Sequence, residues 1–471
     1  MTLTTKNKLL IFCIGLFVLN FILKFIFISS TDIGLDEPFT LFHAQKNVSD
    51  IIELPKTDIH PPLHILIIHF WINLFGTGIV SARFLSVLFS ALAAVAIFLT
   101  GKRFFSFKTG LIASLIFTAS TIEMFYAHDA RVYPIFIFLS ISNLFLFLRI
   151  IDSGKDKNIK LQILFSIVNI LLCYLHFFGF VILFAEALLC LLISQYRVHF
   201  KIIFLSISAV LLSFSWYIPI ILDRFKATSH GNWIPEPLMS DLYTMIWRFS
   251  NVPIIAVTFI AILLFTTIFK WKQINSETNS KFKTLLILFS ICYFGLFIIS
   301  WIIPVFVDRY LLFTSIYFYL LISYSLVNLT SNVKLNLIIA FVPVTIMFAT
   351  LDLKKGKRTK TNAMTEFVSP MMEEPVSVII TPVWFDVNFT YYYNREWFKY
   401  TQHLNDTLKS HSIFLANHAE NIPVLNSNFP VILIDNNTGN DSIKMFLNKT
   451  YNYKGEKEFG DGLKVMLFTT K

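Results

Sequence analysis

The sequence predicts an all-α, multi-pass membrane protein followed by a small C-terminal α/β domain. Of its 471 residues, 55% are hydrophobic and only 14% are charged, whereas a soluble protein of this length needs far more polar surface to cover its core. Apolar runs of roughly 16–22 residues recur up to position 351, and each can cross about 30 Å of hydrocarbon as a helix. After residue 352 the pattern changes. We therefore divide the chain into a transmembrane domain, 1–351, and a second domain, 352–471.

About eleven transmembrane helices are expected from the lengths of the apolar runs. The segment 62–75 is too short and too rich in His and Asn to span, so it is predicted to lie in the membrane interface with Leu63, Ile67 and Phe70 toward lipid. The spans are predicted at residues 9–29, 79–100, 109–126, 132–150, 161–177, 179–195, 201–221, 253–270, 284–303, 310–327 and 335–351.

The loops between these spans indicate the orientation of the chain. One alternating set of loops is about twice as rich in Lys and Arg as the other, and the richer set is expected to face the cytoplasm. The N-terminus is then cytoplasmic and the C-terminal domain is periplasmic or extracellular. Because this asymmetry accounts for the net charge of +10, no nucleic-acid partner is expected. The four cysteines lie within apolar runs without metal-ligand spacing.

The C-terminal domain is predicted to be a small α/β domain. Residues 376–383, 431–434 and 465–468 have the apolar, β-branched composition of buried strands, and 441–451 has a helical pattern. Alternating strands and helices over about 120 residues are typical of a small layered domain.

Polar residues that apolar segments would not tolerate collect in the loops predicted to be external. Ionisable residues at a membrane surface are costly and usually functional. The candidate site residues in these loops are Asp36, Glu37, His60, Asp129, Arg131, Tyr133, His176, Arg309 and Tyr310.

Glycosyl transfer from a phosphate leaving group suits these residue types. A base must deprotonate the acceptor hydroxyl, and cations must neutralise the departing phosphate. We assign Asp36 as the base, with Glu37 as its partner or as a group that orients the acceptor. Arg131 and Arg309 can each give a forked pair of hydrogen bonds to phosphate, and tyrosine hydroxyls at 133 and 310 can add donors.

The charged residues also have structural interpretations, which stay open at this point. Asp36 and Glu37 suit the N-terminus of a helix before Pro38, where acids are favourable. Arg131 and Arg309 can each pair with the aspartate beside them in sequence, or extend to the membrane interface.

The histidines and one further arginine have structural alternatives as well. His60, before two prolines, can end the loop and orient the interfacial helix. His176 can be a hydrogen-bonded histidine at a helix end. Arg83 is expected to extend to the lipid headgroups.

Taken in order, several segments resemble the bacterial protein-mannosyltransferase-like glycosyltransferases of the GT-C fold. They are GLDEPFTLFHAQ, DIHPPLHILIIHFWINLFG, ARFLSVLFSALAAV, AHDARVYPIFIFLS, CYLHFFGFVILFAEALL and PVFVDRYLL. The resemblance covers about residues 30–325. It implies a polyprenyl-phosphate-linked sugar donor and an inverting transfer on the outer face of the cytoplasmic (inner) membrane.

The resemblance also implies residue roles. Asp36 is the base of the family's first-loop acidic pair. Asp129, Arg131 and Tyr133 match an acid–Ala–Arg–x–Tyr motif, and Arg309 with Tyr310 matches a later Arg–Tyr pair. Two residues depart from the pattern, since His128 replaces a common Gln and Pro134 replaces a small or polar residue.

The sequence leaves the acceptor, the use of a metal and one alternative function open. The acceptor can be a protein, a lipid or a glycan. No metal site is assigned, although a divalent metal is left open because members of the family differ in metal use. The rival is a lipid-linked sugar flippase or transporter, which predicts internal repeats and Gly- or Pro-broken spans with charges at mid-membrane. Few glycines lie in the spans here, and the charges lie at helix ends.

Overall fold

The computed structural model describes residues 5–56, 60–153, 158–227, 234–270, 276–354, 359–399, 401–439 and 441–471. The chain forms two compact units. Residues 1–27, 52–64 and 83–355 form the first, and 28–51, 65–82 and 356–471 form the second. The second unit thus combines the C-terminal region with two segments from the first 82 residues.

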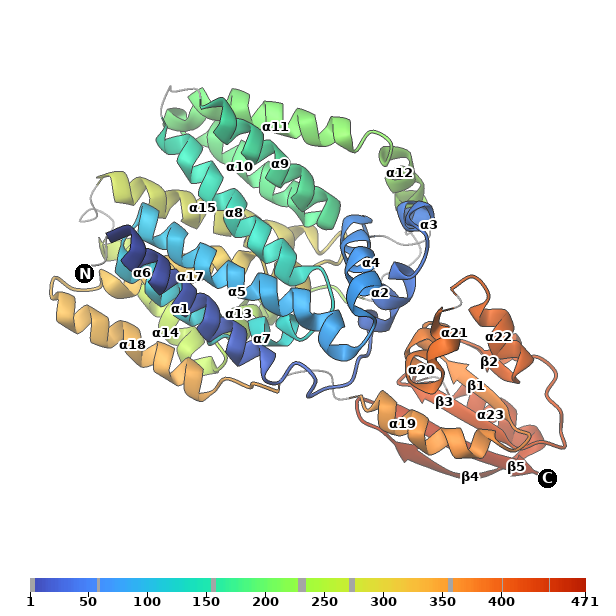
Figure 1. Ribbon diagram of the computed structural model, residues 1–471. Helices are drawn as coiled ribbons and strands as arrows, with labels where there is room; N and C mark the ends of the chain where they lie inside the picture. Colours follow the sequence, from blue (N-terminus) through green and yellow to red (C-terminus); the bar gives the residue numbers. More distant parts are fainter. Residues whose placement is uncertain are drawn as a thin grey trace. The chain divides into compact units, whose positions relative to one another are not determined.

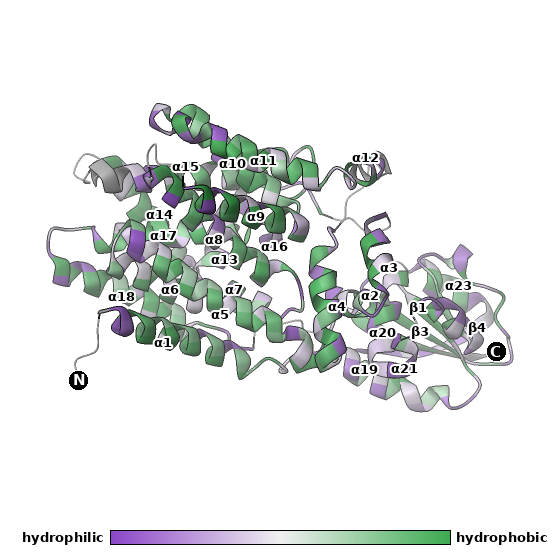
Figure 2. Cartoon of the chain, turned by 45° about the horizontal axis from the view of Figure 1, so that its top comes forward, coloured by the Kyte–Doolittle hydropathy of each residue, from purple (hydrophilic) through white to green (hydrophobic). Residues whose placement is uncertain are grey.

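The first unit is helical, as predicted. Figure 1 shows its helices side by side, and Figure 2 shows that most of their residues are hydrophobic. The helices are α1 Thr5–Phe25, α5 Ile79–Phe104, α6 Phe107–Thr118, α7 Thr121–Ala127, α8 Tyr133–Asp152, α9 Ile159–Leu175, α10 Phe178–Leu192, α11 Phe200–Ser213, α12 Ile218–Ala227, α13 Met239–Phe249, α14 Pro253–Phe265, α15 Ser276–Ile299, α16 Asp308–Leu311, α17 Thr314–Val327 and α18 Val333–Ala349.

Several of these helices are long and apolar enough to cross a membrane. Among the described residues there are five such helices, or up to seven if two bent helix pairs are each one span. The bent pairs are α6 with α7, at 63°, and α13 with the helix that starts at Pro253, at 101°. Five shorter apolar helices accompany them. The multi-pass helical class is confirmed, and the number of eleven spans stays a prediction.

Helix α17 forms the centre of the first unit. Every residue from Thr314 to Leu326 is buried, and the helix packs against α6, α14, α15 and α18. A helix that is apolar all round is typical of the core of a large helical protein. Elsewhere in this unit, α9 packs against α8, α10 and α11.

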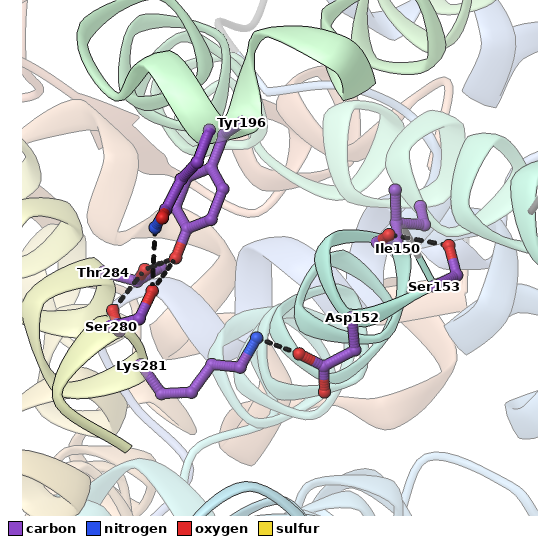
Figure 3. Close-up of polar contacts among 8 residues, drawn as sticks. Ile150, Asp152, Ser153, Tyr196, Ser280, Lys281 and Thr284 are labelled. Carbon is purple, nitrogen blue, oxygen red and sulfur yellow. Dashed lines mark hydrogen bonds and ion pairs between the residues drawn. The ribbon is translucent and has the colours of Figure 1, made fainter. Parts of the chain in front are cut away.

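Polar contacts tie the C-terminal end of α8 and the 3₁₀-helix η2 (Ser194–His199) to the start of α15 (Figure 3). Lys281 forms an ion pair with Asp152. The Tyr196 hydroxyl lies 2.6 Å from Ser280 Oγ and 2.9 Å from Thr284 Oγ1. These contacts fix three elements that adjoin loops predicted to be cytoplasmic.

The second unit contains a five-stranded mixed sheet in the order β2-β1-β3-β5-β4. β1 runs parallel to β2 and β3, whereas β5 runs antiparallel to β3 and β4. The strands are β1 Ser377–Thr381, β2 Ile413–Leu415, β3 Val431–Asn436, β4 Tyr451–Glu458 and β5 Leu463–Thr470. The helices of this unit are α2 Asp36–Ala44, α3 Val48–Glu53, α4 Leu63–Phe75, α19 Thr361–Val368, α20 Asp386–Tyr393, α21 Arg395–Lys399, α22 Leu404–Ser410 and α23 Ser442–Thr450, although the ends of α3 and α4 extend into the first unit.

The predicted strands at 376–383, 431–434 and 465–468 and the helix at 441–451 are all confirmed, as β1, β3, β5 and α23. Their apolar side chains form one core that includes Ile379, Leu433, Leu447, Met466 and Phe468. The predicted interfacial helix at 62–75 corresponds to α4, where Phe70 is exposed as expected, whereas Leu63 and Ile67 are half-buried.

Candidate active site

The loop between α7 and α8 holds two of the predicted site residues, Asp129 and Arg131, and a third, Tyr133, is the first residue of α8. His128 ends α7, and its Nε2 lies 2.6 Å from the backbone carbonyl oxygen of Lys24. Ser86 Oγ donates to the Asp129 carbonyl at 2.7 Å, and that carbonyl also accepts from the Arg131 amide at 2.7 Å. These bonds fix a short buried loop in which Asp129 and Arg131 are each 7% exposed.

Both departures from the family pattern fit this loop. Pro134 lies in the first turn of α8, where the missing N–H of proline costs no helical hydrogen bond and its fixed φ favours helix initiation. His128 bonds to the end of α1. The unusual residues therefore stabilise the local backbone.

Predicted site residues from four separate segments meet around His176. Its ring centroid lies 6.2 Å from that of His60, 6.3 Å from that of Tyr133 and 5.4 Å from that of Tyr310. The charges of Arg131 and Arg309 also act on His176. All five partners were singled out from the sequence, and the structure brings them together within the first unit.

His176 itself has the helix-end geometry of its structural alternative. It follows the last residue of α9, and its Nδ1 accepts a hydrogen bond from the Phe178 amide at 3.3 Å. Its ring is 7% exposed and also packs against Phe136. His176 thus anchors the ring cluster through the backbone.

Asp308 holds α16 against two other helices. One carboxylate oxygen accepts from the Tyr126 hydroxyl at 2.9 Å, and the other lies 2.6 Å from the Arg248 guanidinium. The Arg309 guanidinium lies 5.4 Å from the ring centroid of Tyr310. Asp308 therefore fixes the start of the helix that carries the predicted phosphate-binding Arg–Tyr pair.

The predicted base lies in the second unit. Asp36 and Glu37 form the first turn of α2, the position that their structural alternative requires. Glu37 is fully buried, and its Oε2 accepts from the Gly34 amide at 3.3 Å, while Asp36 is half-buried. The residue before them, Leu35, has φ 51° and ψ −118°, a backbone conformation that is strained for a residue with a side chain.

Comparison with known proteins identifies the architecture. Residues 59–222 match the family model for dolichyl-phosphate-mannose-protein mannosyltransferase. Among solved structures, ArnT from Cupriavidus metallidurans bound to undecaprenyl phosphate superposes with a TM-score of 0.61 at 10% identity, covering 98% of both chains. The chain has the GT-C glycosyltransferase fold.

Archaeal proteins support the same assignment of the fold. The Archaeoglobus fulgidus oligosaccharyltransferase in complex with Zn and sulfate gives a TM-score of 0.53 at 11% identity, covering 97% of this chain and 73% of the other. AglB from the same organism, in complex with an inhibitory peptide and a dolichol-phosphate, gives 0.54 at 10% identity, covering 98% and 74%. No protein of curated function matches the chain in sequence. The resemblance drawn from the sequence motifs is confirmed by the family model over residues 59–222 and by the GT-C fold.

Sequence reasoning missed a buried polar layer beneath the α7–α8 loop of this GT-C domain. Lys24 is fully buried, and its Nζ donates to Ser90 Oγ at 2.6 Å. Glu123 is 2% exposed and accepts from Ser315 Oγ at 2.8 Å. The opposite charges of Lys24 and Glu123 act on each other. The sequence did contain one sign of this layer, because Lys24 lies inside the apolar run at 9–29.

Arg83 is a correction to the sequence interpretation. It was expected to extend to the lipid headgroups, but its side chain is fully buried near the start of α5. An arginine is buried only with partners, so Arg83 belongs to the polar interior of the GT-C domain.

A metal site in a protein is built from several His, Cys, Asp or Glu side chains that lie close together. Within the described ranges, no group of three or more His, Cys, Asp or Glu side chains lies close enough to hold a metal ion.

Proposed function

We propose that this protein transfers a sugar from a polyprenyl-phosphate-linked donor to an acceptor hydroxyl, with inversion, on the outer face of the cytoplasmic membrane. The meeting of the Tyr133 and Tyr310 rings with His176 carries the proposal, because Arg131 lies in the buried loop just before Tyr133 and the Arg309 guanidinium lies 5.4 Å from the Tyr310 ring centroid. One buried and one half-buried arginine suit a phosphate leaving group. The ArnT structure contains undecaprenyl phosphate and the AglB structure contains dolichol-phosphate, which supports a lipid phosphate here.

The reaction is a single displacement. The Asp36 carboxylate accepts the proton of the acceptor hydroxyl, and the acceptor oxygen attacks the anomeric carbon of the sugar. The bond between that carbon and the phosphate oxygen breaks, and its electron pair leaves with the polyprenyl phosphate. Arg131 and Arg309 neutralise the additional negative charge, and the tyrosine hydroxyls at 133 and 310 donate hydrogen bonds to the phosphate oxygens.

The other site residues position these groups. His60 and His176 pack the aromatic wall beside the phosphate site. Asp129 holds the Arg131 amide through its backbone carbonyl, and Glu37 orients the acceptor beside Asp36. The acceptor is a protein, a lipid or a glycan.

Reconstituted protein tests the proposal directly. Proteoliposomes are given a radiolabelled polyprenyl-phosphate sugar and a membrane extract that supplies acceptors. We expect labelled acceptor with the wild type. Asp36→Asn keeps the shape of the side chain but not its basicity, so transfer should fall by about 10²- to 10⁴-fold while donor binding is retained. Full transfer by Asp36→Asn would reject this base.

The same proteoliposomes separate transfer from the rival function. A flippase or transporter moves the labelled donor across the bilayer without forming a new glycoside. We expect the appearance of a new glycoside that depends on the acceptor. Translocation of intact donor with no glycoside formed would favour the transporter. Chelation of divalent cations before the assay tests metal use, because a metal-dependent transfer is lost on chelation and restored by added divalent cation.

A further inference from the structure

The loop that leads into Asp36 is held by helices of the C-terminal domain. The Ile33 amide donates to the Tyr392 hydroxyl at 2.6 Å, and Asn388 Nδ2 donates to the Leu35 carbonyl at 3.2 Å. Tyr392 and Asn388 both lie on α20, about 350 residues further along the chain. Helix α2, which follows this loop, packs against α20 within the second unit. Figure 1 shows α2 in blue and α20 in orange.

A second helix of the same domain contacts the start of this loop. The Asn362 amide, in the first turn of α19, donates to Asp32 Oδ2 at 2.9 Å. The loop is therefore held at Asp32, Ile33 and Leu35, at three successive points just before Asp36.

The strained residue lies between these contacts and Asp36. Leu35 has a positive φ of 51°, and its side chain is 43% exposed, so packing of its own side chain does not enforce the conformation. Conformations of this kind cost about 1–3 kcal/mol and persist where the surroundings fix them. The bonds from α20 to Ile33 and Leu35 help to do so, together with the hydrogen bonds between Gly34 and Glu37 within the turn.

These contacts are partly shielded from water. Ile33 and Asn388 are both fully buried, and a buried amide or carbonyl that loses its partner keeps the full desolvation cost. Burial, and to a lesser extent the negative charge of Asp32, raise the pKa of Tyr392, so its hydroxyl stays neutral over the physiological range. The hydrogen bonds that join Tyr392 and Asn388 to Ile33 and Leu35 are called the clamp. The clamp therefore keeps the same protonation state across the physiological pH range.

The C-terminal domain also contacts the segments that flank the loop in sequence. Gln45 Nε2, just after α2, donates to the Phe398 carbonyl at 3.1 Å. The Tyr391 hydroxyl donates to the Thr77 carbonyl, between α4 and α5, at 2.9 Å. Three segments of the first 82 residues are thus seated on α20 and α21.

We infer that Tyr392 and Asn388 are positioning residues that set the orientation of Asp36 by fixing the backbone of residues 33–35. The C-terminal domain then serves the catalytic step itself. This inference rests on the proposed function, in which Asp36 is the general base.

The test compares Tyr392→Phe and Asn388→Leu with the wild type in full-length protein. Each variant removes one hydrogen bond to the loop and leaves the ring or the volume nearly unchanged. We expect kcat to fall about tenfold while KM for the donor stays within twofold, because the donor phosphate is bound by other residues. Tyr393→Phe is the matched control, since Tyr393 stacks on Phe389 of the same helix, and it should keep the wild-type kcat.

A coupled measurement separates positioning from general destabilisation. In an Asp36→Asn background no carboxylate base is left to orient, so adding Tyr392→Phe should not lower the residual rate further. Hydrogen exchange of the Ile33 amide should be faster in Tyr392→Phe, and this readout does not depend on activity. Wild-type kcat in both clamp variants, or an equal loss in the Asp36→Asn background, would overturn the inference.

The two hypotheses fail in different ways. If Asp36→Asn retains full transfer, the proposed base is wrong whatever the clamp variants do. If Asp36→Asn is inactive and Tyr392→Phe has the wild-type kcat and amide exchange, the base stands and the positioning role is wrong.

Discussion

The guanidinium of Arg248 lies 2.6 Å from a carboxylate oxygen of Asp308, 60 residues away in sequence. Because Asp308 begins α16, this ion pair bears on the placement of the adjacent Arg309 and Tyr310. The two side chains are 52% and 29% exposed, so the pair stabilises the fold by only about 0.2–1 kcal/mol. Its main effect is therefore expected on the site.

Arg248→Met should raise KM for the donor about 3- to 10-fold while the thermal unfolding midpoint changes little. The physical reason is that the Asp308 carboxylate loses one of its two contacts to other helices, whereas the Tyr126 bond remains. Steady-state kinetics with labelled donor measures the effect. Arg248→Lys keeps the positive charge, so its KM for the donor should lie between those of the wild type and Arg248→Met. An unchanged KM in Arg248→Met would contradict the prediction.

Arg131→Ala should weaken donor binding about 10- to 100-fold, whereas Arg131→Lys should lose less. Lysine keeps the positive charge but cannot make the forked pair of hydrogen bonds to phosphate. Equilibrium binding of labelled polyprenyl phosphate measures the difference. Arg149→Ala, at the opposite end of α8, is the control and should bind like the wild type. Equal binding by Arg131→Ala and the control would remove the phosphate role.

Lys281→Met should lower the free energy of unfolding by about 1–3 kcal/mol without changing transfer at low temperature. The variant leaves Asp152 without its ion-pair partner (Figure 3). Removing one partner of a fully buried pair costs about 3–5 kcal/mol, and the loss is smaller here because Asp152 is 25% exposed while Lys281 is 7% exposed. Thermal unfolding in detergent measures it, and Lys283→Met, two residues away on α15, is the control. A lowered kcat in Lys281→Met would contradict the prediction, because it would show that the Lys281–Asp152 ion pair affects catalysis.

Asp386 should make the stability of the protein depend on pH. Burial raises the pKa of its carboxyl from 3.8 to about 6, so the folded state favours the protonated form. The contribution to stability is therefore full below about pH 4 and is lost as the pH rises to about 6. Because the carboxyl is partly exposed, the loss is about 1–2 kcal/mol, below the ~3 kcal/mol that the shift in pKa alone would give.

Asp386→Asn removes this titration and keeps the oxygen that accepts the Val387 amide. The variant and the wild type should unfold at the same temperature at pH 4, and the variant should be the more stable of the two at pH 8. Thermal unfolding of the full-length protein across this range measures the difference. A constant difference at all pH values would exclude Asp386 as the titrating group.

The apolar runs predicted most of the helices to within a few residues, as for 161–177 and α9. They did not predict the 63° break between α6 and α7 inside the expected span at 109–126. Asn251 satisfies the backbone at that break, because its side chain accepts from the Thr121 amide and donates to the Ala119 carbonyl, each at 2.7 Å. A partner 130 residues away leaves no signal in a local window.

Two strands escaped prediction for local reasons. β2 has only three residues, Ile413–Leu415. β4, Tyr451–Glu458, is an edge strand whose side chains are mostly exposed, so it lacks the alternation of apolar and polar residues by which a strand is recognised.

The sequence predicted the residues of the candidate site better than the buried residues that lie beside the site. Tyr133, His176 and Tyr310 were chosen because they lie at helix ends expected on one face, and their rings do meet. Lys24 and Glu123 were overlooked because each lies within or beside an apolar run, and only tertiary packing reveals that both are buried. Spacing along a sequence identifies side chains with suitable chemistry, but not the distant residues that hold them.

The bilayer can act on the helices of this protein only where they meet lipid. Helix α17 has 14 residues and is about 21 Å long at 1.5 Å per residue, shorter than the ~30 Å of hydrocarbon, yet protein surrounds it on every side. By contrast, Leu10, Ile11 and Ile14 of α1 are more than half exposed. A thicker or thinner membrane should therefore tilt peripheral helices such as α1, while the centre of the domain keeps its geometry from one lipid composition to another.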